Sequence, residues 1–283
     1  MIKRSGVRTS SVKLEKAMNK FIAAMDNSGG SAGGVLDLYG QDWTEENKMQ
    51  RIHEYRLRMM GSPRFNSDNI WGAILYKDSV DRGAVPVLDK MGIRSILKID
   101  SGCNPNGTLK QFPVKQMIQY ALLNDCTGTK MRSVVHSADD LNEIVDQQFV
   151  LAKTISDSGL LPIVEPEVPI NHADKANVEE MLAANIRAHL ADFDGNCILK
   201  LTPPDTPNLY HEFTSMDNVT KVVFLSGGYD TNRACNMLGL NDDVSASFSR
   251  ALSEGLQYSM SDDEFNSTID ANIFRIVAES TPF

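Results

Sequence analysis

Short apolar segments recur along the chain and alternate with segments of helical periodicity. The apolar segments carry aliphatic and β-branched residues on both of their faces, which is typical of strands buried in a parallel sheet. These segments lie at residues 21–26, 70–76, 93–100, 129–135, 160–168, 197–202, 221–228 and 244–249. The pattern therefore predicts eight strands.

The segments between the strands repeat apolar residues at three- and four-residue steps. Residues 138–159 are an example, with Leu141, Ile144 and Ile155 on one stripe. Either Ser137 or Asp139 can cap this helix, and Gly159 stands where a helix usually ends. The same periodicity predicts helices within residues 177–193 and 262–280.

Strands alternating with helices predict a parallel sheet covered by helices, and eight such units in 283 residues predict a closed (β/α)8 TIM barrel of the α/β class. An open doubly wound sheet is the alternative, but no GxGxxG motif follows the first strand. We find no internal repeat or linker, so we expect a single domain over residues 1–283. Residues 1–20 are polar and basic and are expected to form an N-terminal extension or helix.

Composition excludes several classes of function. The formal net charge of -9 argues against nucleic acid as a partner, and no apolar stretch is long enough to cross a membrane. The four cysteines form no CxxC pair and the five histidines stand alone, so we expect reduced thiols, no metal and no other cofactor. We accordingly expect a cytoplasmic protein that acts on a small molecule; a homo-oligomer is possible, and the sequence leaves the oligomeric state open.

The predicted strands end in charged residues or glycine instead of continuing apolar. In a (β/α)8 barrel the carboxyl ends of all strands form one face, and their inward-pointing residues converge on one cavity. Lys130 and Arg132 are two residues apart, as are Glu165 and Glu167, so each pair faces the same side of its strand. The residues at these ends are Asp26, Lys98, Asp100, Lys130, Arg132, Glu165, Glu167, Lys200 and the Ser226–Gly228 turn.

Lys200 lies inside the apolar segment CILKLT, where an ammonium group would be poorly solvated. A lysine in a low-dielectric pocket near other cations has a lowered pKa and can attack a carbonyl as a free amine. We therefore interpret Lys200 as a Schiff-base nucleophile. The available carboxylates for the accompanying proton transfers are Glu165, Glu167 and Asp26.

The Ser226–Gly228 turn offers a second kind of chemistry. A strand end with successive glycines can expose backbone N–H groups to a phosphate, and Arg250 at the start of a following helix can supply a cation. The turn is therefore a candidate phosphate site, and its alternative interpretation is an ordinary turn without a ligand.

These motifs occur in an order that resembles one family. The stretches FIAAMDNSGGS, LKID, GTKMRS, PIVEPEV, LKLT, VVFLSGG and ASFSRAL span residues 21–252 and are similar to class I fructose-bisphosphate aldolases of the short bacterial type. The resemblance implies a (β/α)8 barrel without a metal that reversibly cleaves fructose 1,6-bisphosphate to dihydroxyacetone phosphate and glyceraldehyde 3-phosphate.

The resemblance also implies roles for individual residues. Lys200 would form the Schiff base, Glu165 would serve as acid and base in imine formation, and Asp26 would help to deprotonate the substrate hydroxyl. The residues implied in the electrostatics around the nucleophile are Lys130, Arg132 and Glu167. Those implied in binding the two phosphates are Ser226, Gly227, Gly228 and Arg250 on the ketone side, and Ser28, Ser31 and Lys98 on the other side, with Arg132 nearby.

Other functions stay open at the level of sequence. The imine chemistry could serve another phosphorylated ketose, such as tagatose 1,6-bisphosphate or a monophosphate. A catalytically silent barrel that acts as a scaffold, and a metal-dependent aldolase, are further alternatives. The group that transfers a proton to the carbanion is unassigned, because the chain ends ESTPF without the C-terminal tyrosine of animal enzymes.

Overall fold

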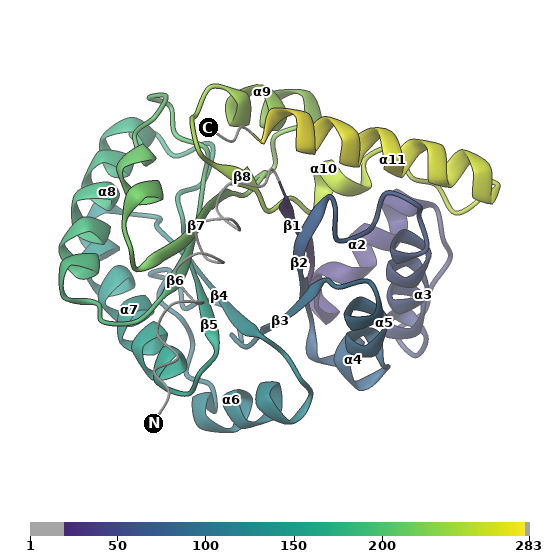
Figure 1. The fold of residues 1–283 in the computed structure, drawn as a ribbon, viewed down its shortest axis with the longest axis horizontal. Helices are drawn as coiled ribbons and strands as arrows, with labels where there is room; N and C mark the ends of the chain where they lie inside the picture. Colours follow the sequence, from purple (N-terminus) through teal and green to yellow (C-terminus); the bar gives the residue numbers. More distant parts are fainter. Residues whose placement is uncertain (1–19, 281–283) are drawn as a thin grey trace, which may run out of the picture.

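The computed structural model describes residues 20–280 and shows eight parallel strands in one sheet, ordered along the sheet as in the sequence (Figure 1). The Ala24 N–H donates to the Phe248 carbonyl at 3.1 Å and so joins the first strand to the segment after the last. The sheet is therefore a nearly closed barrel, which confirms the predicted (β/α)8 fold over the open alternative. The strands are β1 (Phe21–Met25), β2 (Ile70–Leu75), β3 (Arg94–Lys98), β4 (Gly128–Val134), β5 (Leu161–Glu167), β6 (Cys197–Leu201), β7 (Val219–Phe224) and β8 (Ser245–Ala246).

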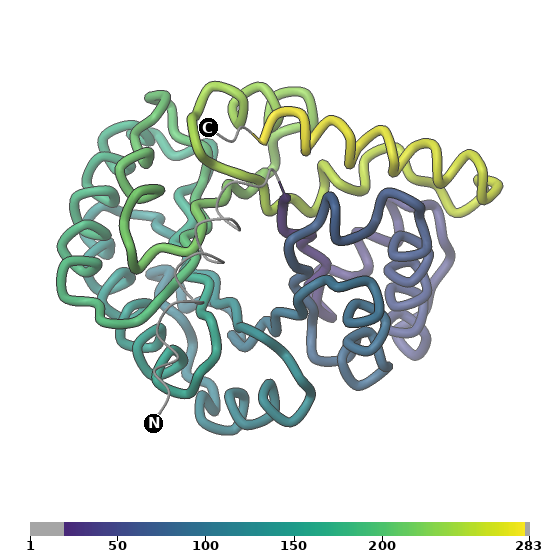
Figure 2. The backbone as a smooth tube through the Cα atoms, in the orientation of Figure 1, coloured from purple at the N-terminus to yellow at the C-terminus, as the bar shows by residue number. Residues whose placement is uncertain are grey.

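Helices surround the barrel, and the chain winds once around it from the purple to the yellow end of the tube (Figures 1 and 2). The predicted N-terminal extension or helix, residues 1–20, lies outside the described residues apart from Lys20. The helices are α2 (Gly29–Tyr39), α3 (Lys48–Met60), α4 (Lys77–Asp81), α5 (Ala84–Lys90), α6 (Val114–Leu123), α7 (Leu141–Asp157), α8 (Lys175–Asp192), α9 (Thr231–Gly239), α10 (Arg250–Ser253) and α11 (Asp262–Glu279), with 3-10 turns η1 (Ala138–Asp140) and η2 (His211–Ser215).

The three helices predicted from periodicity are present as α7, α8 and α11. The turn η1 precedes α7, and its N-cap Ser137 accepts a hydrogen bond from the Asp139 N–H at 3.2 Å. Beyond α7, Gly159 adopts a φ of +89°, the left-handed conformation that glycine takes without strain. Across residues 20–280 every helix is too short or too polar to span a lipid bilayer.

The interior of the barrel changes from apolar to charged along β3, β5 and β6. Ile96, Ile163 and Ile198 belong to the buried cluster inside the barrel. Each is followed two residues later by a residue that lines the mouth, namely Lys98, Glu165 and Lys200. Burial of each isoleucine stabilises the fold by about 1.5–3 kcal/mol. The alternation of the strand directs the next inward residue to the carboxyl end, so the apolar layer forms a rigid floor beneath a charged layer.

Candidate active site

A cavity of about 1010 Å³ opens at the carboxyl ends of the strands. It brings together residues from strands far apart in sequence, as predicted. The predicted residues that line it are Asp26, Ser31, Lys98, Lys130, Arg132, Glu165, Glu167, Lys200, Ser226, Gly227, Gly228 and Arg250. Ser28 does not line the cavity: it is the N-cap of α2, and its N–H donates to the Ser31 hydroxyl at 3.1 Å.

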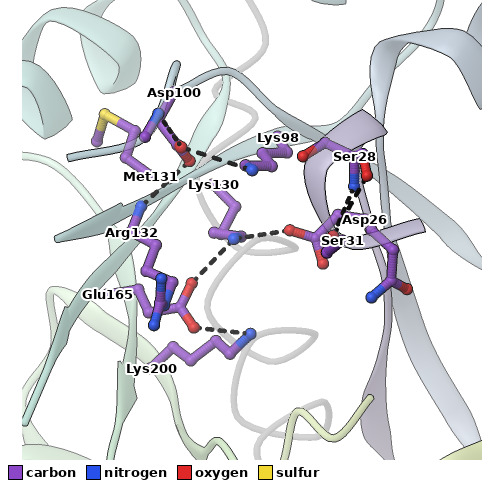
Figure 3. Close-up of polar contacts among 12 residues, drawn as sticks. Asp26, Ser28, Ser31, Lys98, Asp100, Lys130, Met131, Arg132, Glu165 and Lys200 are labelled. Carbon is purple, nitrogen blue, oxygen red and sulfur yellow. Dashed lines mark hydrogen bonds and ion pairs between the residues drawn. The ribbon is translucent and has the colours of Figure 1, made fainter. Parts of the chain in front are cut away.

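Four of these residues form a chain of alternating charges across the mouth (Figure 3). Lys200 Nζ lies 3.0 Å from Glu165 Oε1, and Glu165 Oε2 lies 3.1 Å from Lys130 Nζ. Lys130 Nζ in turn lies 2.7 Å from Asp26 Oδ2. The chain crosses from β6 through β5 and β4 to the residue after β1, so it connects neighbours in the sheet and then spans the mouth. Each buried charge has an opposite charge beside it, which offsets the cost of removing these groups from water.

The charge chain keeps both carboxyl groups ionised. Burial raises the pKa of Glu165, but the Lys130 and Lys200 ammonium groups outweigh that effect and hold this pKa below its usual value. The same two lysines hold the pKa of Asp26 far below its usual value against the opposing effect of burial. Burial lowers the pKa of Lys130, but the facing Asp26 and Glu165 carboxylates raise it well above its usual value. The central Lys130 is therefore a fixed cation.

A second group of charges lies beside this chain. Arg132 Nε donates to Glu167 Oε2 at 2.5 Å, as expected for inward-facing residues of β4 and β5. Asp100 accepts the Arg132 backbone N–H at 3.3 Å and lies 3.7 Å from Lys98 Nζ. Asp100 thus contacts both Lys98 and Arg132, two residues predicted to bind phosphate. The sequence marked Asp100 only as a charged residue at a strand end.

The Ser226–Gly228 turn follows β7 in the conformation that its glycines permit. Gly227 and Gly228 have φ values of +56° and +108°. A Cβ atom on Gly227 would lie 2.8 Å from Cγ2 of Ile170, so a side chain there would collide with its neighbour. A Cβ atom on Gly228 would lie 3.8 Å from Nη1 of Arg250, which places the guanidinium group beside the bare backbone of the turn. This arrangement suits an anion.

Sequence reasoning missed Arg56, a buried residue of α3 that lines the cavity. Its sequence context RIHEYRLR contains three arginines on one helix, and periodicity alone does not tell which of them reaches the barrel mouth. Within residues 20–280, no group of three or more His, Cys, Asp or Glu side chains is arranged to hold a metal ion.

Acid should destabilise the protein partly through the site carboxylates. The ordinary pKa values of Asp26 and Glu165 are 3.8 and 4.5, and both are lowered in the folded state. The unfolded chain therefore binds more protons, so this stability is fully present above the ordinary pKa values and is lost progressively as the pH falls from them towards the lower folded-state pKa values. We expect urea unfolding to show a smaller loss of stability from about pH 6 to about pH 3 for Asp26→Asn than for the wild type. Equal losses would contradict the ionised state of Asp26.

Comparison with known proteins extends this description. No protein-family model matches the chain. The structure is similar to the fructose-bisphosphate aldolase from Plasmodium falciparum, solved in complex with TRAP and a small-molecule inhibitor, with a TM-score of 0.76 and 18% identity over 96% of this chain and 95% of that chain. It also matches the tetrameric deoxyribose phosphate aldolase from Aeropyrum pernix, with a TM-score of 0.42 and 13% identity over 84% of this chain and 88% of that chain. The first likeness shows that the chain shares the barrel fold of that protein along nearly its whole length.

Proposed function

We propose that the protein is a class I fructose-bisphosphate aldolase that cleaves its substrate through an imine on Lys200. The observation that carries the proposal is a buried lysine, in a large cavity, with a carboxylate oxygen 3.0 Å from its Nζ. A lysine so placed can form a covalent intermediate with a ketone, and the adjacent carboxylate can move the protons that this requires. The fold likeness and the ordered sequence motifs support the same proposal.

Imine formation uses Lys200 and Glu165. The ammonium group of Lys200 loses a proton to Glu165, and the amine attacks the C2 carbonyl carbon of the ketose. The attacking nitrogen releases a proton and the former carbonyl oxygen takes one up, which gives a neutral carbinolamine. Glu165, still holding the proton from Lys200, then donates it to this hydroxyl, which leaves as water. The neutral nitrogen of the carbinolamine removes one of the two cations that lower the pKa of Glu165, so this carboxyl group becomes easier to protonate when it must act.

Carbon–carbon cleavage uses Asp26 and Lys130. The carboxylate of Asp26 takes the proton of the C4 hydroxyl, the bond between C3 and C4 breaks, and glyceraldehyde 3-phosphate is released. The electron pair of that bond moves into the protonated imine and forms an enamine. Protonation of C3 and hydrolysis of the imine then release dihydroxyacetone phosphate and restore Lys200. Lys130, 2.7 Å from Asp26, keeps this carboxylate ionised and oriented towards the mouth.

Two cationic regions fit two phosphates. The turn of Ser226, Gly227 and Gly228 with Arg250 is proposed to bind the ketone-side phosphate, and Ser31 with Lys98 to bind the other phosphate. Arg132, held by Glu167 and Asp100, adds a positive charge beside Lys98. Ser28, the N-cap of α2, donates its N–H to Ser31 and is proposed to orient the start of that helix beside the same phosphate.

We further propose that the enzyme acts in the cytoplasm without a metal ion. The chemistry of imine catalysis supplies its own electron sink, the protonated nitrogen on Lys200, and needs no Lewis acid. All four cysteines are free thiols, which fits a reducing compartment.

The test is borohydride reduction of the purified full-length protein with fructose 1,6-bisphosphate in the presence of a chelator, followed by peptide mass mapping. We expect a triose-phosphate adduct on Lys200. A folded protein that forms no adduct would remove the proposal and favour a silent barrel. If tagatose 1,6-bisphosphate or a ketose monophosphate is cleaved faster than fructose 1,6-bisphosphate, the imine chemistry stands and the proposed substrate is wrong.

A further inference from the structure

Arg56 ties three segments together beneath one wall of the cavity. It extends from α3, is only 1% exposed and is among the largest fully buried side chains of the protein. Its Nη2 donates to the backbone carbonyl of Asn27 at 2.5 Å, and its Nη1 donates to the hydroxyl of Ser79 in α4 at 2.6 Å. Asn27 directly follows Asp26, so the guanidinium group holds the peptide next to the proposed base.

This burial is unfavourable for the fold by itself. Both of these hydrogen bonds go to neutral oxygen atoms, and Nε has no hydrogen-bond partner among the described residues. Burial lowers the pKa of Arg56 to about 10, while the charges of Asp26 and Asp78 oppose this change. The side chain therefore stays charged at neutral pH. If Arg56 only filled space in the fold, an apolar side chain would stabilise this position better. The buried, incompletely hydrogen-bonded guanidinium group of Arg56 therefore points to a role at the site.

The segment that Arg56 holds needs an external support. Asp26 is followed by Asn27, Ser28 and two glycines, and glycine permits many backbone conformations. The capping contact between Ser28 and Ser31 orders the start of α2. The hydrogen bond from Arg56 to Asn27 orders the peptide between Asp26 and that cap, while the opposite charges of Arg56 and Asp26 attract each other.

We propose that Arg56 is a positioning residue for carbon–carbon cleavage that acts through Asp26. It fixes the turn between β1 and α2 so that the Asp26 carboxylate meets the C4 hydroxyl of the substrate. This inference rests on the proposed function and adds a residue to it. Because imine formation uses Lys200 and Glu165, loss of Arg56 should impair cleavage and leave imine formation intact.

The first test compares Arg56→Met and Arg56→Lys with wild type. For Arg56→Met we expect kcat of fructose 1,6-bisphosphate cleavage to fall by about 10²-fold, the effect of a base misplaced by about 1 Å, with KM changed less than about threefold. Borohydride trapping of dihydroxyacetone phosphate on Lys200 should proceed at the wild-type rate. Arg56→Lys keeps the charge and one donor group, so its kcat should lie between those of Arg56→Met and wild type. If Arg56→Met does not fold, the same measurements are made on Arg56→Lys.

A second test asks whether Arg56 acts through Asp26. In an Asp26→Asn background, Arg56→Met should reduce cleavage no further, whereas independent effects would multiply. Arg51→Met is the matched control, because Arg51 lies on the same helix in an ion pair with Glu54 and does not line the cavity. It should retain wild-type kcat.

Three outcomes would overturn the inference alone: multiplicative effects in the double variant, a raised KM with unchanged kcat, or equal loss of trapping and cleavage in a folded variant. The second of these would mean that Arg56 binds the substrate directly. A wild-type protein that forms no adduct on Lys200 would instead overturn the proposed function, and this inference with it.

Discussion

Lys200→Met is expected to abolish cleavage of fructose 1,6-bisphosphate, with kcat reduced by at least about 10⁴-fold, as for loss of a covalent nucleophile. Methionine has a similar length and an unbranched chain, so it fits the buried position of Lys200 without a nitrogen that can attack a carbonyl. The variant should also lose the borohydride-trapped adduct. The measurements are steady-state cleavage and peptide mass mapping after reduction.

Lys98→Met is the matched control for this prediction. Lys98 also lines the cavity and pairs with a carboxylate, Asp100, at 3.7 Å, but it does not contact Glu165 in the charge chain. We expect it to weaken binding of the bisphosphate and to keep the adduct on Lys200. Cleavage above a trace in Lys200→Met, with circular dichroism and thermal unfolding like those of wild type, would show that another group carries the reaction.

Glu165→Gln is expected to slow imine formation by about 10²- to 10⁴-fold, the usual contribution of a positioned acid or base. Glutamine keeps the shape of the side chain between Lys130 and Lys200 but cannot take or return a proton. It also removes the negative charge that both lysines share, at 3.1 and 3.0 Å, so some loss of stability should accompany the effect. The measurement is the single-turnover rate of adduct formation with dihydroxyacetone phosphate.

The control for Glu165→Gln is the same change two residues along β5. Glu167 pairs with Arg132 beside the charge chain, whereas the carboxylate that pairs with Lys200 is Glu165. Glu167→Gln should therefore alter the single-turnover rate less than about tenfold. Equal rates for Glu165→Gln and wild type would contradict the assignment of Glu165, and a larger effect at Glu167 would transfer the proton-transfer role to that residue.

The charge chain explains how a lysine can be buried inside an otherwise apolar strand. An isolated ammonium group in the barrel would be strongly unfavourable, but Lys200 contacts one carboxylate and that carboxylate contacts a second lysine. The network is connected from Lys200 to Asp26 through alternating charges. Its members are therefore coupled, and substitutions within it should not have additive effects on stability.

Much of the fold and part of the site could be predicted from local sequence. Strand and helix periodicity depends on neighbouring residues, so the eight strands and the helices α7, α8 and α11 were predictable. The period of two also placed Lys130 with Arg132, and Glu165 with Glu167, on the same side of their strands. Convergence of these residues then followed from the geometry of a barrel.

Other parts of the site were not predictable from local patterns. The contact between Lys130 and Asp26 spans the barrel mouth, and its 2.7 Å distance depends on how the closed sheet curves. Ser28 matched a phosphate-binding motif, and only the structure shows that it is also the N-cap of α2. In the sequence, Arg56 resembles any arginine on an amphipathic helix. Which face of α3 meets the turn between β1 and α2 depends on how the helix packs, and periodicity does not determine this.

The sequence by itself determined the class of fold, the charged residues at the strand ends and the position of Lys200 inside an apolar strand, because these depend on local periodicity and residue type. Only the tertiary structure decided which charges touch, which residues line the cavity and that the buried Arg56 donates to the Asn27 carbonyl next to Asp26. Ion pairs and hydrogen bonds require atoms to lie within about 3 Å of one another. Between residues distant in the chain, such distances are set by closure of the barrel and by the packing of its helices.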